Sequence, residues 1–292
     1  CVRARCRATS RSSDHRLGGA PAHGLGGDVA QRQGRSIGGP GLSRGLIESV
    51  NAHGKLWLDE HDQPTHYGTG LGGMLTYEKK ESIQNNRKCV LQPFVRGGGL
   101  WYYDFGRWFS SGWWSIPEYM EDIEKLTKLM KDRFEYELNP PADVLMVMDT
   151  RVYFHTGNST SADPITDALS VNVMVPKAYM SGASVATCYL SDLERMNLDQ
   201  YKVIVFVNCF ALTPQQVTKI RNITAKNGRH LLWMTCPGFY GGNTLNPEAV
   251  SKVAGINLKP MEYNGFPVMK IRVNHVDLQM GGQPMLQSAS AK

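Results

Sequence analysis

The sequence predicts an α/β protein with two parallel-sheet units in series, and three observations lead to this prediction. Short apolar strands alternate with helical segments along most of the chain. Consecutive prolines, Pro140 and Pro141, separate an earlier strand-and-helix pattern from a later one, because prolines end a helix and stiffen a linker. The later pattern contains near-continuous β-branched runs, which are typical of strands buried on both faces of a sheet.

Composition places the chain among soluble globular proteins. Its 292 residues are enough for two ordinary domains, and 41% hydrophobic with 20% charged residues is a globular balance. No uninterrupted apolar stretch reaches the length of a membrane helix, roughly 18 residues, and no apolar leader follows the first arginines. We therefore expect a cytoplasmic protein that does not bind membranes.

Residues 1–45 differ from the rest of the chain. They contain eight arginines, two aspartates and no lysine, so they account for the whole net charge of +6. They show neither helical nor strand periodicity, and we expect a disordered Arg/Gly-rich tail, with an out-of-frame or mis-joined start as a hypothesis for its origin. The tail has no aromatic residue on which bases stack, so we expect no nucleic-acid binding.

The first unit is predicted over residues 46–139. A short strand over residues 54–60 ends on two carboxylates, and a helix follows over residues 78–96. After three glycines comes a strand over residues 100–105, and then an amphipathic helix over residues 116–138. The residues expected to face inward are Ile83, Val90, Leu91 and Phe94 in the first helix and Ile123, Leu126, Leu129, Met130 and Phe134 in the second.

The second unit is predicted over residues 142–275. Its predicted strands are residues 143–148, 184–189, 201–207 and 229–234. A helix near residues 165–180 and a helix that begins at the capping residue Thr213 connect them. Four strands with intervening helices imply a doubly wound, flavodoxin-like sheet. Residues 276–292 are polar and lose periodicity, and we expect an irregular tail there.

Two carboxylates lie where a (β/α) barrel places its catalytic groups. Asp59 and Glu60 end the first predicted strand, and catalytic side chains of such barrels project from the carboxyl ends of strands. Glycosidases need paired carboxylates, one to protonate the leaving oxygen and one to attack the sugar. The alternative is that both residues simply begin a solvated loop.

Residues 101–114 form the densest aromatic segment of the chain. Flat indole and phenol rings match the apolar C–H faces of pyranose rings. Alternation along a strand predicts that Trp101, Tyr103 and Phe105 belong to the core. The residues expected to contact a sugar are Asp104, Arg107, Trp108, Trp113 and Trp114. For the three tryptophans, packing within the loop is the alternative.

Cysteines and histidines are weaker candidates. The six cysteines contain no CxxC pair, which predicts reduced thiols and no metal site. Cys209 and Cys236 follow strands but lack the Gly-x-Cys-x-Gly elbow of an exposed nucleophile, so buried or loop thiols are expected. His53, His61 and His66 lack helical metal-ligand spacing and are expected to be polar loop residues or sugar hydrogen-bonding groups. No cofactor is expected.

The segments SVNAHGKLWLDEHD (residues 49–62) and RGGGLWYYDFGRW (residues 96–108) resemble the last third of the barrel in β-galactosidases of glycoside hydrolase family 42. The resemblance implies that residues 46–139 are the incomplete C-terminal part of a TIM (β/α)8 barrel. It also implies that Glu60 is the nucleophile of a retaining enzyme that hydrolyses galactosides. The family takes its acid/base glutamate from an earlier strand, and residues 1–45 contain no glutamate, so we expect this residue to be missing.

The second unit carries its own resemblance and two alternatives. Residues from about 142 to 260 resemble the trimerisation domain of the same family, which has a flavodoxin-like or class I glutamine-amidotransferase-like fold. In one alternative to the glycosidase, only this unit folds well and acts as a non-catalytic module for homo-oligomer formation. In the other, it binds a small ligand at the edge of its sheet, by analogy with proteins of that fold.

Overall fold

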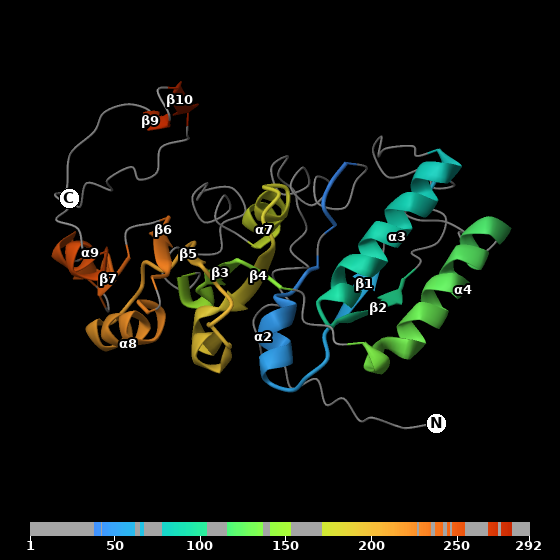
Figure 1. Ribbon diagram of the computed structural model, residues 1–292, viewed down its shortest axis with the longest axis horizontal. Coiled ribbons are helices and arrows are strands. Elements are labelled where there is room, and N and C mark those ends of the chain that lie inside the picture. Colours follow the sequence, from blue (N-terminus) through green and yellow to red (C-terminus); the bar gives the residue numbers. More distant parts are fainter. Residues whose placement is uncertain are drawn as a thin grey trace.

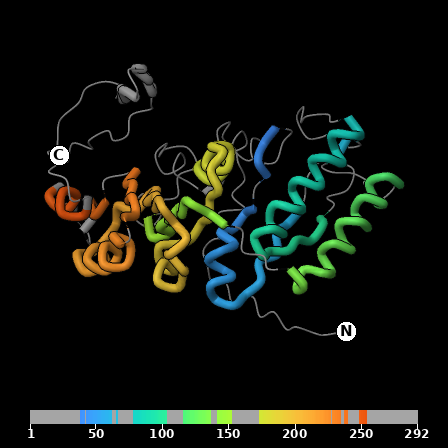
Figure 2. Tube along the Cα trace, viewed as in Figure 1, coloured from blue at the N-terminus to red at the C-terminus, as the bar shows by residue number. Residues whose placement is uncertain are grey.

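The computed structural model describes residues 38–41, 43–61, 65–66, 78–103, 116–136, 141–152, 171–226, 228–234, 237–241, 244–245, 247–254, 268–273 and 276–281. From β1 to β6 helices alternate with strands that form parallel sheets, which confirms the α/β class (Figure 1). Two parallel-sheet units follow each other along the long axis of the molecule. The helix α2, drawn in blue in Figure 2, lies between them.

The first unit contains two strands and two helices. β1 (Leu58–His61) and β2 (Gly99–Tyr102) pair in parallel. The connecting helix α3 (Lys79–Val95) lies within its predicted bounds. α4 (Pro117–Lys131) packs beside α3, and the 3-10 turn η4 (Asp132–Glu135) follows it.

The inward faces of α3 and α4 are more polar than predicted. The buried residues of α3 recur every three or four positions, as helical geometry requires, and are Ser82, Asn85, Asn86, Cys89, Val90, Pro93 and Phe94. In α4, Leu126 is buried as predicted, together with Tyr119 and Asp122. The prediction for Phe134 is wrong. The helix ends at Lys131, the tighter 3-10 turn breaks the 3.6-residue period, and Phe134 is 85% exposed.

The second unit contains a four-stranded parallel sheet. Each strand falls inside a predicted range: β3 (Val144–Met148), β4 (Val185–Tyr189), β5 (Val203–Phe206) and β6 (His230–Trp233). Their order in the sheet is β4-β3-β5-β6. The β-branched run of β5 has a strand on each side, as its composition predicts.

Helices cover both faces of this sheet. α7 (Val171–Tyr179) packs on one face, whereas α8 (Pro214–Thr224) and the 3-10 turn η6 (Leu190–Arg195) pack on the other. Alternating strand residues divide between two cores: Leu145, Val147, Cys188, Ile204 and Phe206 on the α8 side, and Met146, Met148, Val185 and Val207 on the α7 side. α8 begins as predicted, because Thr213 Oγ1 accepts a hydrogen bond from Gln216 N at 3.2 Å.

The remaining elements are short. The 3-10 turn η5 (Thr150–Val152) follows β3. Near the C-terminus, β7 (Tyr240–Gly241) pairs with β8 (Thr244–Leu245), and α9 (Pro247–Ala254) follows them. β9 (Val268–Val273) and β10 (Val276–Gly281) form an antiparallel hairpin. This hairpin corrects the prediction of an irregular tail for residues 276–281, since cross-strand pairing orders residues that have no clear periodicity of their own. Residues 282–292 lie outside the described residues.

The chain joins the fold before residue 46. Gly41 and Ser43 are buried, and Arg44 hydrogen-bonds to β1. Gly45 lies against the indole of Trp57, where an added Cβ would stand 2.7 Å from Cζ2. The predicted tail boundary at residue 45 is therefore wrong, because these contacts tie the residues before it to β1. Residues 1–37 lie outside the described residues.

The helix α2 (Ile47–Ala52) connects the two units. It leads into β1 of the first unit, and it packs against β4 and η6 of the second. Leu46, just before it, is 1% exposed and lies in the α7-side core. Ser49 Oγ accepts a hydrogen bond from Tyr189 N at 2.7 Å. Within the described residues β4 pairs only with β3, and α2 covers its other side and accepts the N–H of Tyr189.

A largely buried ion pair reinforces this connection. Glu48 of α2 binds Arg96, which ends α3, and the side chains are only 15% and 13% exposed. The second carboxylate oxygen of Glu48 accepts from Thr187 Oγ1 of β4 at 2.8 Å. The guanidinium of Arg96 lies 4.3 Å from the centre of the Tyr179 ring of α7. We call this group of four residues the α2 joint.

Candidate active site

Glu60 lies on the exposed face of the first sheet. Side chains alternate along β1, so Asp59 and His61 are buried toward α3, whereas Leu58 is 51% exposed and shares its face with Glu60. Trp101 stands opposite Glu60 in the parallel register and is 42% exposed. A carboxylate and an indole therefore lie side by side near the carboxyl ends of two parallel strands.

Arg44 binds both carboxylates of β1. Its Nη1 donates to Glu60 Oε1 at 2.7 Å, and its backbone N–H donates to Asp59 Oδ1 at 3.0 Å. Trp57 Nε1 also donates to Asp59 Oδ1, at 3.4 Å. Asp59 is 4% exposed, but the side chain of Glu60 is 30% exposed. Asp59 thus anchors the chain, and Glu60 is the carboxylate that solvent reaches.

Trp101 of β2 and Tyr103, which follows the strand, are not core residues. Trp101 and Tyr103 are 42% and 39% exposed, and their rings meet edge to face at 5.3 Å. The prediction that both are buried is wrong, because strand alternation shows which residues share a face but not which face is covered. Trp101 therefore offers a flat, half-exposed apolar ring beside the carboxylate of Glu60.

The other predicted sugar contacts lie outside the described residues. They are Asp104, Arg107, Trp108, Trp113 and Trp114, together with the predicted core residue Phe105.

A buried polar network lies behind β2, between the strands and the two helices. Tyr102 donates its hydroxyl to Asn86 Oδ1 at 3.0 Å, and Asn86 Nδ2 donates to Asp122 Oδ2 at 3.3 Å. Arg87 Nε donates to the other oxygen of Asp122 at 2.6 Å, and His61 meets the Tyr102 ring edge to face at 5.0 Å. Burial raises the pKa of the Tyr102 phenol above its usual range. Sequence reasoning missed this network, although adjacent asparagines in the middle of a helix are a signal for one.

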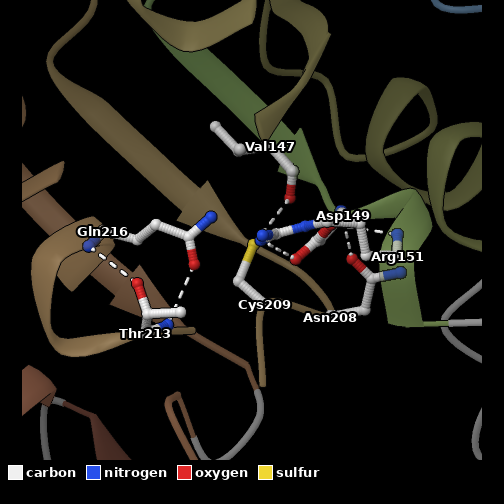
Figure 3. A network of polar contacts seen from close by, with 7 residues as sticks. All are labelled: Val147, Asp149, Arg151, Asn208, Cys209, Thr213 and Gln216. Atoms are coloured by element: carbon white, nitrogen blue, oxygen red, sulfur yellow. Dashed lines mark hydrogen bonds and ion pairs between the residues drawn. The ribbon is translucent and has the colours of Figure 1, made fainter. Parts of the chain in front are cut away.

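The described thiols are inert. Cys89, Cys188 and Cys209 are free and buried. Burial raises the pKa of Cys188 and of Cys209 well above the usual thiol value. Cys209 Sγ lies 4.0 Å from the carbonyl oxygen of Val147 (Figure 3). The expectation of a buried thiol is confirmed for Cys209, and Cys236 lies outside the described residues.

The three candidate histidines have separate environments. His53 Nε2 lies 2.8 Å from Asp192 Oδ1, across the contact between the two units. His61 is buried within β1, so its expected place in a loop is wrong. The backbone N–H of His66 donates to Ser82 Oγ at 2.7 Å, and burial lowers the pKa of the His66 ring. Within the described ranges no three metal-binding side chains gather at one point.

A cavity of about 390 Å³ opens between η6 and the end of α8. Its lining includes Leu193, Met196, Leu198, Ile223, Lys226 and Arg229. Arg229 donates to the carbonyls of Leu198, Tyr201 and Thr224, so its guanidinium is committed to the backbone. The cavity contains none of the sequence-predicted site residues, and we assign it no function.

No protein-family model matches this chain, and no curated protein matches its sequence. Among the helices that the structure describes, none combines the length and apolar character needed to cross a membrane. What the protein does must therefore be inferred from the arrangement of its own residues.

Proposed function

We propose that the chain carries the nucleophile side of a retaining glycoside hydrolase of β-galactosidase type, with Glu60 as the nucleophile. One observation carries the proposal: Glu60 and the half-exposed Trp101 lie side by side near the carboxyl ends of paired parallel strands. A carboxylate at this place is suited to attack an anomeric carbon, while the indole holds the apolar face of the sugar ring.

The layering of the first unit supports the idea of a barrel fragment. In a (β/α) barrel, helices cover the outer face of the sheet and the other face points to the interior. β1, α3, β2 and α4 follow each other in the order of two barrel repeats, with α3 on the side of Asp59 and His61. Glu60 and Trp101 occupy the side that would face the interior.

Glu60 would act in the first of two chemical steps. A carboxylate oxygen forms a bond to the anomeric carbon as the bond to the leaving oxygen breaks, and a second carboxyl group, held about 5–5.5 Å away in retaining enzymes, protonates that oxygen. Arg44, 2.7 Å from Glu60, orients the nucleophile. The proposed sugar contacts remain Asp104, Trp108, Trp113 and Trp114. No residue is assigned as the acid.

A mechanism-based label tests Glu60 without needing that acid. In 2,4-dinitrophenyl 2-deoxy-2-fluoro-β-galactoside the dinitrophenolate leaves without protonation, and the fluorine slows hydrolysis of the sugar ester. We expect mass spectrometry to find one fluorogalactosyl group on the peptide that contains Glu60. Glu60→Gln should abolish the adduct, and Glu118→Gln, at an exposed site on α4, should not. An adduct on another residue, or none on the wild type, would refute the assignment.

The second unit supports a second candidate, a non-catalytic module for homo-oligomer formation. Counted along the chain, the strand order β4-β3-β5-β6 is the 2-1-3-4 order of flavodoxin-like sheets. Within the described residues β6 pairs only with β5, and Leu232 on this edge strand is 54% exposed. Light scattering after size-exclusion should show an oligomer that Leu232→Lys dissociates. A monomeric wild type would exclude this function.

A further inference from the structure

The strand order of the second sheet creates a topological switch point between β3 and β5, away from Glu60 in the first unit. From β3 the chain reaches β4 by way of α7 on one face, whereas from β5 it reaches β6 by way of α8 on the other face. The connections therefore leave the carboxyl ends of β3 and β5 in opposite directions. In open α/β sheets, ligands bind in the crevice at such a point.

Side chains that follow both strands meet at this point (Figure 3). Asp149 follows β3, and its backbone N–H donates to Oδ1 of Asn208, which follows β5, at 2.7 Å. The two residues are 2% and 3% exposed. The Asp149 carboxylate accepts from Arg151 Nε at 2.9 Å and from Nη2 at 2.7 Å. These buried groups hold the guanidinium of Arg151, whose side chain is 40% exposed, in one orientation.

One edge of this guanidinium remains available. Asp149 binds the edge formed by Nε and Nη2, and this hydrogen bonding raises the pKa of Arg151. Nη1 forms no hydrogen bond to another part of the chain that the structure describes. The Nη1 and Nη2 edge is thus a planar pair of donors, which fits the two oxygens of a carboxylate or phosphate.

The helix α8 begins at the same end of the sheet as Arg151, because it follows the carboxyl end of β5. α8 begins just after the residues that follow β5, and its capping residues Thr213 and Gln216 appear in the same view as Arg151 (Figure 3). The N-terminal end of a helix carries partial positive charge. The end of the sheet that carries Arg151 thus also carries the partial positive charge of α8, whereas Asp149 balances the charge of Arg151 itself.

We propose that a small oxyanion, a carboxylate or phosphate group, binds at this switch point through the open edge of Arg151. Asp149 and Asn208 are positioning residues that hold the guanidinium at the carboxyl ends of β3 and β5. The site lies in the second unit and needs nothing from Glu60, so it goes beyond the proposed glycosidase function.

The full-length protein, labelled with ¹⁵N, tests this site. Sodium phosphate and sodium acetate are titrated separately at constant ionic strength, and the Nε–Hε resonance of Arg151 is followed by NMR. We expect a saturable shift with at least one anion. Saturation with phosphate alone, with acetate alone or with each of them identifies the ligand class. If neither anion gives a saturable shift, the proposal is overturned.

Two variants distinguish binding at Arg151 from nonspecific attraction of anions to positively charged side chains. Arg151→Lys keeps the charge but loses the planar pair of donors, so amide shifts around Asn208 should report binding weakened about tenfold or more. Arg195→Gln removes an exposed arginine and should bind like the wild type. Equal binding by Arg151→Lys would overturn the proposal. If that variant does not fold, the Arg151 resonance of the wild type decides alone.

Discussion

At the scale of single residues, sequence neighbours have different roles. Asp59 and Glu60 are adjacent carboxylates on one strand, yet Asp59 is buried among hydrogen-bond donors and Glu60 is partly exposed beside Trp101. Strand geometry is the cause, because successive side chains point to opposite faces. The exposed carboxylate is the one available for chemistry, and the buried one maintains the position of Arg44.

Substitutions at these two positions should therefore differ in their effect on stability. Asp59→Asn weakens the charge-assisted hydrogen bonds from Arg44 and Trp57 in a buried place, and should lower the free energy of unfolding by about 1–3 kcal/mol. Glu60→Gln breaks an ion pair that water partly screens, and should lower it by less than about 1 kcal/mol. Urea unfolding followed by tryptophan fluorescence measures both. A larger loss for Glu60→Gln would contradict the assigned roles.

The buried thiols predict how stability depends on pH. Folding raises the pKa of Cys188 and of Cys209. A thiol whose pKa is raised by folding contributes its full stabilisation below the pKa of the unfolded thiol, about 8.5. As the pH rises above that value, the thiol ionises in the unfolded state only, and its contribution to stability is lost. The free energy of unfolding should fall between about pH 8.5 and 10. A Cys188→Ala, Cys209→Ala double variant should show a smaller fall, and an equal fall would reject this explanation.

At the scale of elements, α3 and α4 are joined by polar as well as apolar contacts. Leu126 contributes the expected apolar contact, but Asn86 and Asp122 face each other in the interior. A buried polar pair is favourable only when each member keeps its partners. The interface therefore depends on Asp122 more than an apolar interface would depend on any one of its residues.

Replacing Asp122 should be severe for that reason. Asp122→Ala removes the acceptor of both Asn86 Nδ2 and Arg87 Nε and leaves the buried NH2 group of Asn86 without an acceptor, so the free energy of unfolding should fall by about 2–4 kcal/mol. Glu124→Ala, on the exposed side of the same helix, should unfold close to the wild type. Chemical denaturation compares the two. Similar midpoints for both variants would show that the network adds no stability.

At the scale of the whole molecule, the α2 joint makes the two units dependent on each other. The prolines Pro140 and Pro141 mark a boundary along the chain, but α2, which precedes β1, packs against β4 across that boundary. Glu48 is the centre of this contact, because it binds Arg96 of the first unit and Thr187 of the second.

Removing Glu48 should weaken both units together. Glu48→Ala leaves Arg96 largely buried without its anion, and should lower the free energy of unfolding by about 3 kcal/mol. Hydrogen exchange should then rise in α3 and in β4 alike. Glu194→Ala removes an exposed ion pair with Lys219 and serves as the control. Faster exchange in α3 alone would mean that the units are not coupled.

The sequence by itself determined where most strands and helices lie. The β-branched residues of β5 predict a central strand, and Thr213 followed by Pro214 predicts the start of α8. Both predictions succeed because periodicity, side-chain shape and capping act within a few residues of each other. The sequence also placed Glu60 at a strand end, where its candidacy rests on local pattern alone.

Only the tertiary structure decided which groups meet. It buries Asp59 and exposes Glu60 with Trp101, because packing of α3 selects the covered face of β1 and β2. It joins Glu48 to Thr187, and Asp149 to Asn208, which are far apart in the chain. Such pairs follow from strand order and from the path of each connection, and a local pattern of residues does not encode them.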